Sequence, residues 1–220
     1  MKWIYVVAGI ALYIKMVVFP NPTVEASEIS IVETVIRETG VPNAVSGIIF
    51  KNRLYDTIFE VVVFTLSIMG VRFLLSNEEP ENRIYQFSDH PSVVLAQLGA
   101  TISALIGIEL ALRGHLSPGG GFAAGVAGGT AIGLIAVTTS LKLMERYYAK
   151  WHAAKLEKLS VLAFIAIAVI SLVGLQLPAG EFGSLISGSW IPWLNGLVAI
   201  KVTLGSWTAM LLFIRYRGLL

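Results

Sequence analysis

The sequence predicts an all-α, polytopic integral membrane protein with about six transmembrane helices. Of its 220 residues, 55% are apolar and 14% are charged, and the mean hydropathy is +0.76. Soluble domains carry about 25% charged residues, and a chain of this size cannot bury so much apolar surface in one core. Apolar runs of about 20 residues recur, which is the length that crosses a bilayer as a helix. They lack the alternation of transmembrane β-strands.

Two predicted spans form the front of the chain. Residues 3–19 are apolar and end before Pro20, and Lys15 within them favours a retained span over a cleaved signal peptide. The second span, residues 57–75, is followed by a polar run over residues 77–82. This break in composition predicts a two-helix N-terminal unit over residues 1–82 and a four-helix unit over residues 83–220.

Four predicted spans follow in the second unit. Residues 92–112 come after Asp89 and Pro91, which suit a helix start. Residues 122–144 follow a glycine-rich turn. Residues 159–177 end before Pro178, and residues 191–214 end before a basic C-terminus. With six spans, both ends of the chain lie on the same side of the membrane.

The distribution of Lys and Arg predicts the orientation. Ten of these residues fall on the side that holds both termini and four on the opposite side, while Lys15 and Lys201 lie within spans. Basic residues are enriched in cytoplasmic connections. We therefore expect a multi-pass protein of the cell membrane with both termini in the cytoplasm.

Lys201 is the most informative charge, because it falls about ten residues from either end of the last predicted span. A charge at the bilayer centre costs about 2.5–3.5 kcal/mol on insertion scales and requires a partner or a purpose. One interpretation is a lysine that takes part in proton or cation coupling. The other is a structural ion pair with a carboxylate from another span or subunit. Both place Lys201 inside protein rather than against lipid.

Three acidic residues are further candidates for ion handling. Glu109 precedes Arg113 by four residues, an order that favours an ion pair on one helix face. Asp56 and Glu60 are also four residues apart and lie near Arg53, so they either share a proton or cation or neutralise that arginine. Because the spans alternate in direction, we expect Lys15 and these three acids at a similar depth in the outer half, where they could form a network.

A glycine-rich stretch over residues 113–122 is the most distinctive local pattern. It permits a tight turn between two spans, and its exposed carbonyls near His115 and Ser117 could coordinate a cation or relay protons. Small residues at four-residue spacing let helix backbones approach closely. A stripe of such residues follows the turn and predicts a helix-packing face: Gly121, Gly125, Gly129 and Gly133.

Several function classes are excluded or disfavoured. The absence of cysteine excludes Cys-held metal and haem sites, and the spans carry no paired histidines for a b-type haem. The glycine-rich stretch lacks the ending of a phosphate-binding loop, and no nucleophile elbow is present. A net charge of +2 with no basic patch disfavours nucleic acid. We therefore expect no catalytic residues, no bound metal and no cofactor.

Two groups of motifs resemble a known family. Residues 114–122 with Gly125, and residues 192–198 leading to Lys201 and Gly205, resemble the B-type subunit of the Mrp family of multisubunit sodium/proton antiporters. Residues 43–45, Arg53, Asp56 and Glu60 resemble the E-type subunit, which corresponds to the last part of the large A-type subunit. The resemblance covers most of the chain and carries over Asp56, Glu60, His115 and Lys201 as candidates for ion handling.

The resemblance implies a non-catalytic accessory subunit of an ion-translocating module, with other membrane subunits as partners. Such modules occur as standalone antiporters. They also occur with a peripheral iron–sulfur redox arm in archaeal membrane-bound hydrogenases and sulfane sulfur reductases, and a chain that joins E-like and B-like parts fits the reductase type best. The alternative is a structural membrane scaffold that only docks neighbouring subunits.

Overall fold

The computed structural model describes residues 31–81 and 84–218, so the predicted first span with Lys15 lies outside the described residues. The chain divides into two compact units, Met1–Thr34 and Val35–Leu220, and the second is described below. The described residues form helices and loops without a β-strand, which confirms the all-α prediction. The elements are α2 (Ile31–Thr39), α3 (Ala44–Gly47), the π-helix η1 (Ile48–Asn52), α4 (Leu54–Leu75), α5 (His90–Arg113), α6 (Gly121–Ala136), α7 (Leu141–Lys150), α8 (Ala153–Leu172) and α9 (Ile191–Arg217).

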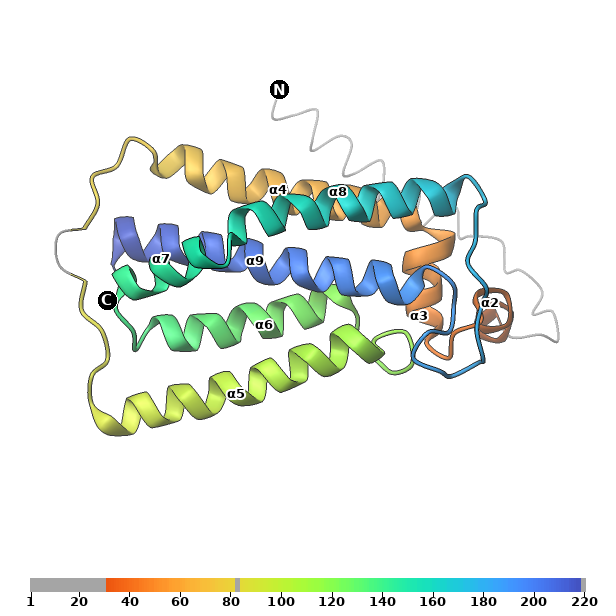
Figure 1. Cartoon of the computed structure of the whole chain (residues 1–220), viewed down its shortest axis with the longest axis horizontal. Coiled ribbons are helices and arrows are strands. Elements are labelled where there is room, and N and C mark those ends of the chain that lie inside the picture. Colours follow the sequence, from red (N-terminus) through yellow and green to blue (C-terminus); the bar gives the residue numbers. More distant parts are fainter. Residues whose placement is uncertain (1–30, 82–83, 219–220) are drawn as a thin grey trace, which may run out of the picture. The chain divides into compact units, whose positions relative to one another are not determined.

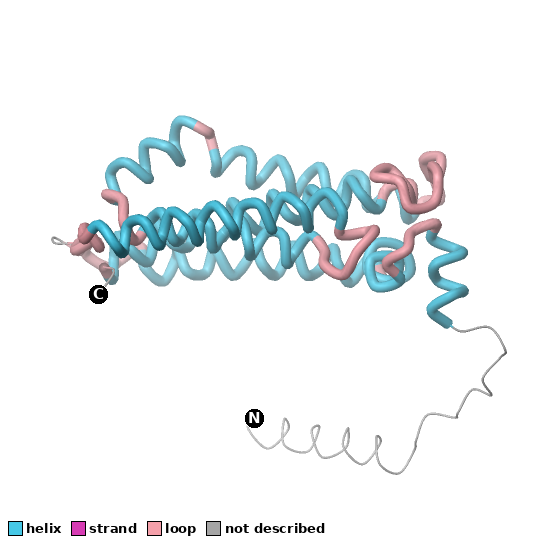
Figure 2. Tube along the Cα trace, turned by 90° about the horizontal axis from the view of Figure 1, so that it is seen from below, coloured by secondary structure: helices cyan, strands magenta, loops and turns pink. Residues whose placement is uncertain are grey.

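The second unit is a bundle built around α9. Helices α4, α6 and α8 pack along α9, and α5 packs mainly on α6 (Figure 1). Most loops gather at the two ends of the bundle (Figure 2). Three described helices are long and apolar enough to cross a membrane, namely α4, α5 and α9, and α6 is a shorter apolar helix. Together with the helical architecture, this confirms a polytopic membrane protein.

The α6 helix corrects the predicted span over residues 122–144. It ends at Ala136, eight residues early, and Thr138 turns its hydroxyl back onto the Ile135 carbonyl. Threonine and serine side chains compete with helical hydrogen bonds in this way, and three such residues occupy positions 138–140. The chain then starts α7, an amphipathic helix whose charges do not suit the apolar interior of a membrane.

The α8 helix also differs from its predicted span, residues 159–177. It starts at Ala153 and ends at Leu172. Between α7 and α8 the chain breaks at His152, which adopts a left-handed backbone conformation with φ of 49°. Because α7 and α8 both contact α9, the two helices follow one another along its length (Figure 1). The earlier start places Glu157 inside a helix rather than in a connection.

Close helix contact explains the glycines of α6. A Cβ atom added at Gly121 or Gly125 would collide with Val198 or Val202 of α9. At Gly129 the added atom would lie 2.7 Å from the Ser206 Cβ, which is closer than real Cβ atoms approach. Gly133 faces Met210 in the same way. The four-residue glycine stripe therefore lies against α9.

The core joins α4, α8 and α9. Its fully buried side chains include Leu54 and Val61 of α4, Phe164 of α8, and Leu194 and Val198 of α9. At the start of α4 the chain passes through α3 and the single turn of π-helix, in which the Arg53 amide donates to the Ile48 carbonyl at 2.7 Å. Turns of π-helix are uncommon in proteins, and those that occur are often near functional sites.

Candidate functional site

An ion pair between α8 and α9 lies inside the bundle. The Lys201 Nζ donates to Oε1 of Glu157, and the two side chains are 1% and 12% exposed. The Lys201 ammonium also lies 5.1 Å from the centre of the Phe64 ring on α4, a cation–π contact. Three helices thus converge on one buried positive charge, which confirms that Lys201 lies inside protein.

Gly205 makes room for this arrangement. It lies one helical turn after Lys201, on the same face of α9. A Cβ atom there would lie 2.5 Å from Cε1 of Phe64 and 3.4 Å from Oε1 of Glu157. The small residue lets the phenyl ring and the carboxylate reach the ammonium together.

Hydroxyl groups extend the pair towards the C-terminal end of α9. Thr208, two turns after Lys201, places its Oγ1 3.4 Å from Oε2 of Glu157 and donates to the Leu204 carbonyl at 3.0 Å. The Tyr148 hydroxyl on α7 lies 2.8 Å from the same Thr208 oxygen. The Tyr148 ring is held edge-on against Trp207, with ring centres 5.3 Å apart. The buried carboxylate is therefore connected to α7 through two hydroxyls.

The energetics of the pair make it either a strong structural constraint or a functional device. Removing one member of a buried pair typically costs about 3–5 kcal/mol, because the remaining charge loses its partner. Replacing both members with apolar residues of similar size is often neutral or stabilising.

His115 lies in the connection between α5 and α6 and is fully buried. Its Nε2 lies 3.3 Å from the Ser184 carbonyl, and its Nδ1 has no partner within residues 31–81 and 84–218. Burial lowers the pKa of His115, although the carbonyls of Ser184 and Leu185 act in the opposite direction. The His115 imidazole is therefore neutral at neutral pH. It lies at the opposite end of α9 from the Tyr148 and Thr208 hydroxyls.

Asn43 binds the glycine-rich turn. Its Nδ2 donates to the carbonyls of Gly114 and Ser117 at 2.7 and 2.8 Å, and its backbone amide donates to the His115 carbonyl at 3.2 Å. Ser46 adds a second bond to the Gly114 carbonyl at 2.7 Å. The carbonyls that the sequence offered for cation coordination therefore accept hydrogen bonds from the start of α3.

Asn195, from the second motif of the sequence, caps a neighbouring helix. Its Nδ2 donates to the carbonyls of Leu110 and Ala111 at 3.1 and 2.7 Å, in the last turn of α5. The last four carbonyls of a helix lack partners within it, and a side-chain donor from α9 supplies two. The motif thus fixes the approach of α5 to α9.

The structure does not bring Glu109 together with Asp56 and Glu60. Asp56 pairs with Arg53 at 2.5 Å, and Glu109 pairs with Arg113 at 3.2 Å, each close by in its own helix region. Glu60 is exposed and has no ion pair among the described residues. Asp56 and Glu60 line a surface cavity of about 460 Å³ beside the π-helix. The predicted network of these acids is thus not formed within the described residues.

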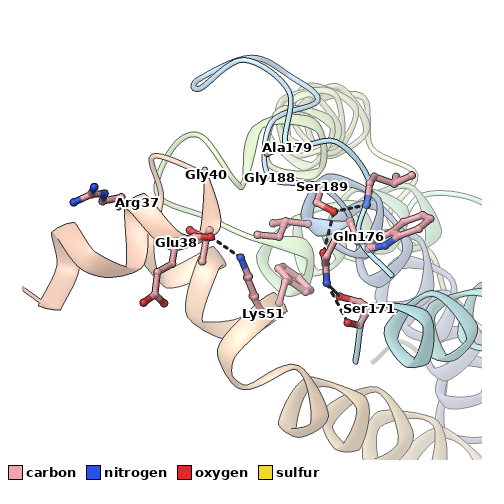
Figure 3. Close-up of a pocket in the computed structure, with 14 residues that line it drawn as sticks. Arg37, Glu38, Gly40, Lys51, Ser171, Gln176, Ala179, Gly188 and Ser189 are labelled. Atoms are coloured by element: carbon pink, nitrogen blue, oxygen red, sulfur yellow. Dashed lines mark hydrogen bonds between the residues drawn. The ribbon is translucent and has the colours of Figure 1, made fainter. Parts of the chain in front are cut away.

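A second cavity, of about 170 Å³, lies near the start of α9 (Figure 3). The Lys51 ammonium donates to the Glu38 carbonyl at 2.5 Å on one side of it. On the other side Gln176 donates to Ser171 and accepts from the Ser189 hydroxyl at 3.0 Å. The Lys51 bond joins η1 to α2, and the Gln176 bonds hold the connection between α8 and α9 against the end of α8.

Glu157 is the functional candidate that sequence reasoning missed. The polar run Lys155, Glu157 and Lys158 placed it in a connection, because the predicted span began at residue 159. One feature of the sequence could have indicated Glu157, because a buried Lys201 requires a carboxylate at its own depth in the bundle. Among the described acidic residues, Glu157 is the buried one.

Comparison with known proteins shows the family of this chain. Residues 91–208, more than half of the chain, match the family described as "Domain related to MnhB subunit of Na+/H+ antiporter". The chain belongs to this MnhB-related family. An uncharacterized protein of Methanocaldococcus jannaschii is 27% identical to this MnhB-related chain, over 78% of this chain and 77% of the relative.

Two solved structures share the fold. A chain of the membrane-bound sulfane sulfur reductase, an archaeal respiratory membrane complex, aligns with a TM-score of 0.68 at 21% identity, over 97% of the MnhB-related chain and 98% of its own length. A chain of the Mrp complex from Dietzia sp. DQ12-45-1b aligns with a TM-score of 0.60 at 16% identity. That alignment covers 98% of the MnhB-related chain and 26% of the longer neighbour.

Proposed function

We propose that the chain is an accessory transmembrane subunit of a Na+/H+ antiporter module in a multisubunit membrane complex, and that Lys201 and Glu157 take part in ion movement. The observation that carries the proposal is the buried ion pair between α8 and α9. Membership of the MnhB-related family supports the antiporter module. The chain itself is non-catalytic, and the sodium ion is cargo rather than cofactor.

The chemistry of the pair suits this role. A proton or a sodium ion that reaches the Glu157 carboxylate competes with the Lys201 ammonium for the same oxygen. Binding of either cation releases Lys201 from its partner, and departure of the cation restores the pair. The pair therefore has two arrangements that a monovalent cation can select, which is the requirement for coupling ion entry to a change in protein contacts.

The partners are other membrane subunits of the module. Large apolar side chains on α5, such as Leu95, Leu98 and Leu105, are exposed in the single chain and require lipid or protein cover. The end-to-end alignment with the sulfane sulfur reductase chain supports a respiratory membrane complex over a standalone antiporter. A peripheral iron–sulfur arm is part of this proposal. In this assembly the protein lies in the cell membrane with both termini in the cytoplasm.

The alternative is a structural scaffold, and one observation favours it. The Lys201–Glu157 pair joins two helices of the same chain, so the charge is satisfied without any transported ion. Under this alternative the pair only fixes α8 against α9.

Single substitutions in the assembled complex separate the two functions. We expect Glu157→Gln, which keeps the shape and a hydrogen-bond acceptor, to lower Na+/H+ exchange in membrane vesicles at least tenfold while partner subunits still co-purify. Glu78→Gln removes the carboxylate from the exposed pair with Arg217 and serves as the matched control, with exchange unchanged. Wild-type exchange in the Glu157→Gln complex would overturn the proposal, and loss of co-purification without a change in exchange per assembled complex would favour the scaffold.

A further inference from the structure

A cavity lies next to Thr208, the residue that contacts the buried pair. It has a volume of about 320 Å³ and lies among α4, α7, α8 and α9. Charged side chains from three of these helices line it, namely Arg72 of α4, Glu145 of α7 and Arg215 of α9. Arg215 and Glu145 form an ion pair at 2.7 Å. The volume accommodates several water molecules, and the polar lining can hold them.

The inner wall of this cavity holds the two hydroxyls that connect to Glu157. Tyr148 and Thr208 both line the cavity, and their oxygens are 2.8 Å apart. Thr208 in turn lies 3.4 Å from Oε2 of Glu157, whose other oxygen binds Lys201. A continuous series of polar groups thus leads from the cavity to the buried ammonium.

We propose that Tyr148 and Thr208 form a proton relay that exchanges protons between this cavity and Glu157. The inference rests on the proposed function, because it assigns the side of the membrane from which the Lys201–Glu157 pair is protonated. That side is the end of the bundle where α9 ends, which the Lys and Arg distribution places in the cytoplasm.

The relay conserves protons at every step. A protonated water (hydronium) in the cavity gives a proton to the Tyr148 oxygen and becomes neutral water, and the Tyr148 hydroxyl proton passes to Oγ1 of Thr208. The original Thr208 proton moves to Oε2 of Glu157, which becomes neutral, and Lys201 loses its counter-charge. Rotation of the two hydroxyls restores the starting arrangement. Thr208 alternates between two acceptors, the Leu204 carbonyl at 3.0 Å and the Glu157 carboxylate.

Charged groups face the relay from each helix packed around it. Arg72 and Arg215 line the cavity, Glu145 neutralises Arg215, and Lys201 faces Glu157 from α9. Burial raises the pKa of Tyr148, so its phenol keeps the proton that it must donate at neutral pH. The spacing of Lys201, Gly205 and Thr208 puts all three on one face of α9.

The relay is tested by removing single oxygens in the assembled complex. Tyr148→Phe and Thr208→Val keep the side-chain shape, and we expect each to lower the initial rate of Na+/H+ exchange in vesicles at least tenfold. Thr208→Ser retains the hydroxyl and should stay within twofold of wild type. Thr203→Val is the matched control on the same helix, because Thr203 donates to the Gly125 carbonyl and lies off the route. Wild-type exchange by both Tyr148→Phe and Thr208→Val would overturn the relay.

Chemical labelling tests the cavity independently of transport. The chain has no cysteine, so Thr208→Cys introduces a unique thiol that is followed by the mass of this subunit. We expect a charged, membrane-impermeant thiosulfonate to modify it from the side where α9 ends and to leave Thr203→Cys unmodified. Failure to modify Thr208→Cys from that side would overturn the proposed route.

The exchange measurements distinguish the relay from the proposed function. If Glu157→Gln abolishes exchange while Tyr148→Phe and Thr208→Val exchange normally, only the relay is wrong. Normal exchange by Glu157→Gln overturns the proposed function itself.

Discussion

At the scale of single residues, the buried polar groups differ in how far they are partnered. Lys201 has a carboxylate and an aromatic ring as partners. Asn195 uses its amide hydrogens on the carbonyls of α5. His115 is fully buried with one nitrogen unpartnered among the described residues, and burial disfavours its charged form. The lowered pKa of His115 links its burial to the pH dependence of stability.

The protein should lose stability as the pH falls because of His115. Its pKa is lower in the folded protein than the ordinary 6.5, so the unfolded chain binds more protons between these two values. Stability is fully present above pH 6.5 and declines as the pH falls towards the folded pKa. The melting temperature of the purified complex between pH 5 and 8 measures this effect. His115→Asn should flatten that part of the curve, and an identical slope in the variant would assign the loss to other groups.

At the scale of helices, sequence patterns predicted the three membrane-length helices α4, α5 and α9 near their observed positions and misplaced the region between α6 and α8. Hydropathy alone extended the predicted span to residue 144, because Thr and Ser lower the mean hydropathy only slightly. Their side chains nevertheless end α6 at Ala136, because they hydrogen-bond to backbone carbonyls of the last turn. Lys201 could be placed inside protein from its depth alone. Glu157 could not, since the left-handed turn at His152 that starts α8 early depends on packing against α9.

Close packing of α4 against α9 gives a prediction at this scale. Gly205→Ala places a methyl group where Phe64 lies, and overpacking of this kind typically costs about 1–3 kcal/mol. We expect a lower melting temperature in detergent and a displaced Phe64 contact with Lys201. Gly196→Ala on the same helix is the matched control, because no atom lies within 4 Å of its added Cβ. Equal melting temperatures for the two variants would contradict the packing described for α9.

At the scale of the molecule, the end of α9 is tied to the connection between α4 and α5. Arg217 pairs with Glu78 at 3.1 Å, and the Glu81 amide donates to the Arg215 carbonyl at 2.8 Å. The connection between α8 and α9 lies at the other end of the bundle (Figure 1). The fold thus separates two groups of loops, and the basic residues predict that the first group faces the cytoplasm.

Cysteine labelling checks this orientation. We expect Glu79→Cys and Gly218→Cys to react with an impermeant reagent from the cytoplasmic side, and Glu181→Cys to react from the opposite side. Because the chain has no native cysteine, each label reports one position. Reaction of positions 79 and 218 from opposite sides would contradict the bundle, and reaction of all three from reversed sides would contradict the predicted orientation.

The central claim is that the buried pair moves ions rather than merely joining two helices. The double variant Lys201→Met with Glu157→Leu tests it most directly, because it removes both charges, leaves neither one stranded and preserves side-chain volume. The measurement is the initial rate of Na+/H+ exchange by the assembled complex in vesicles. We predict normal co-purification of partner subunits with exchange below a tenth of the wild-type rate. Wild-type exchange by the assembled double variant would contradict the claim and leave the pair a structural contact.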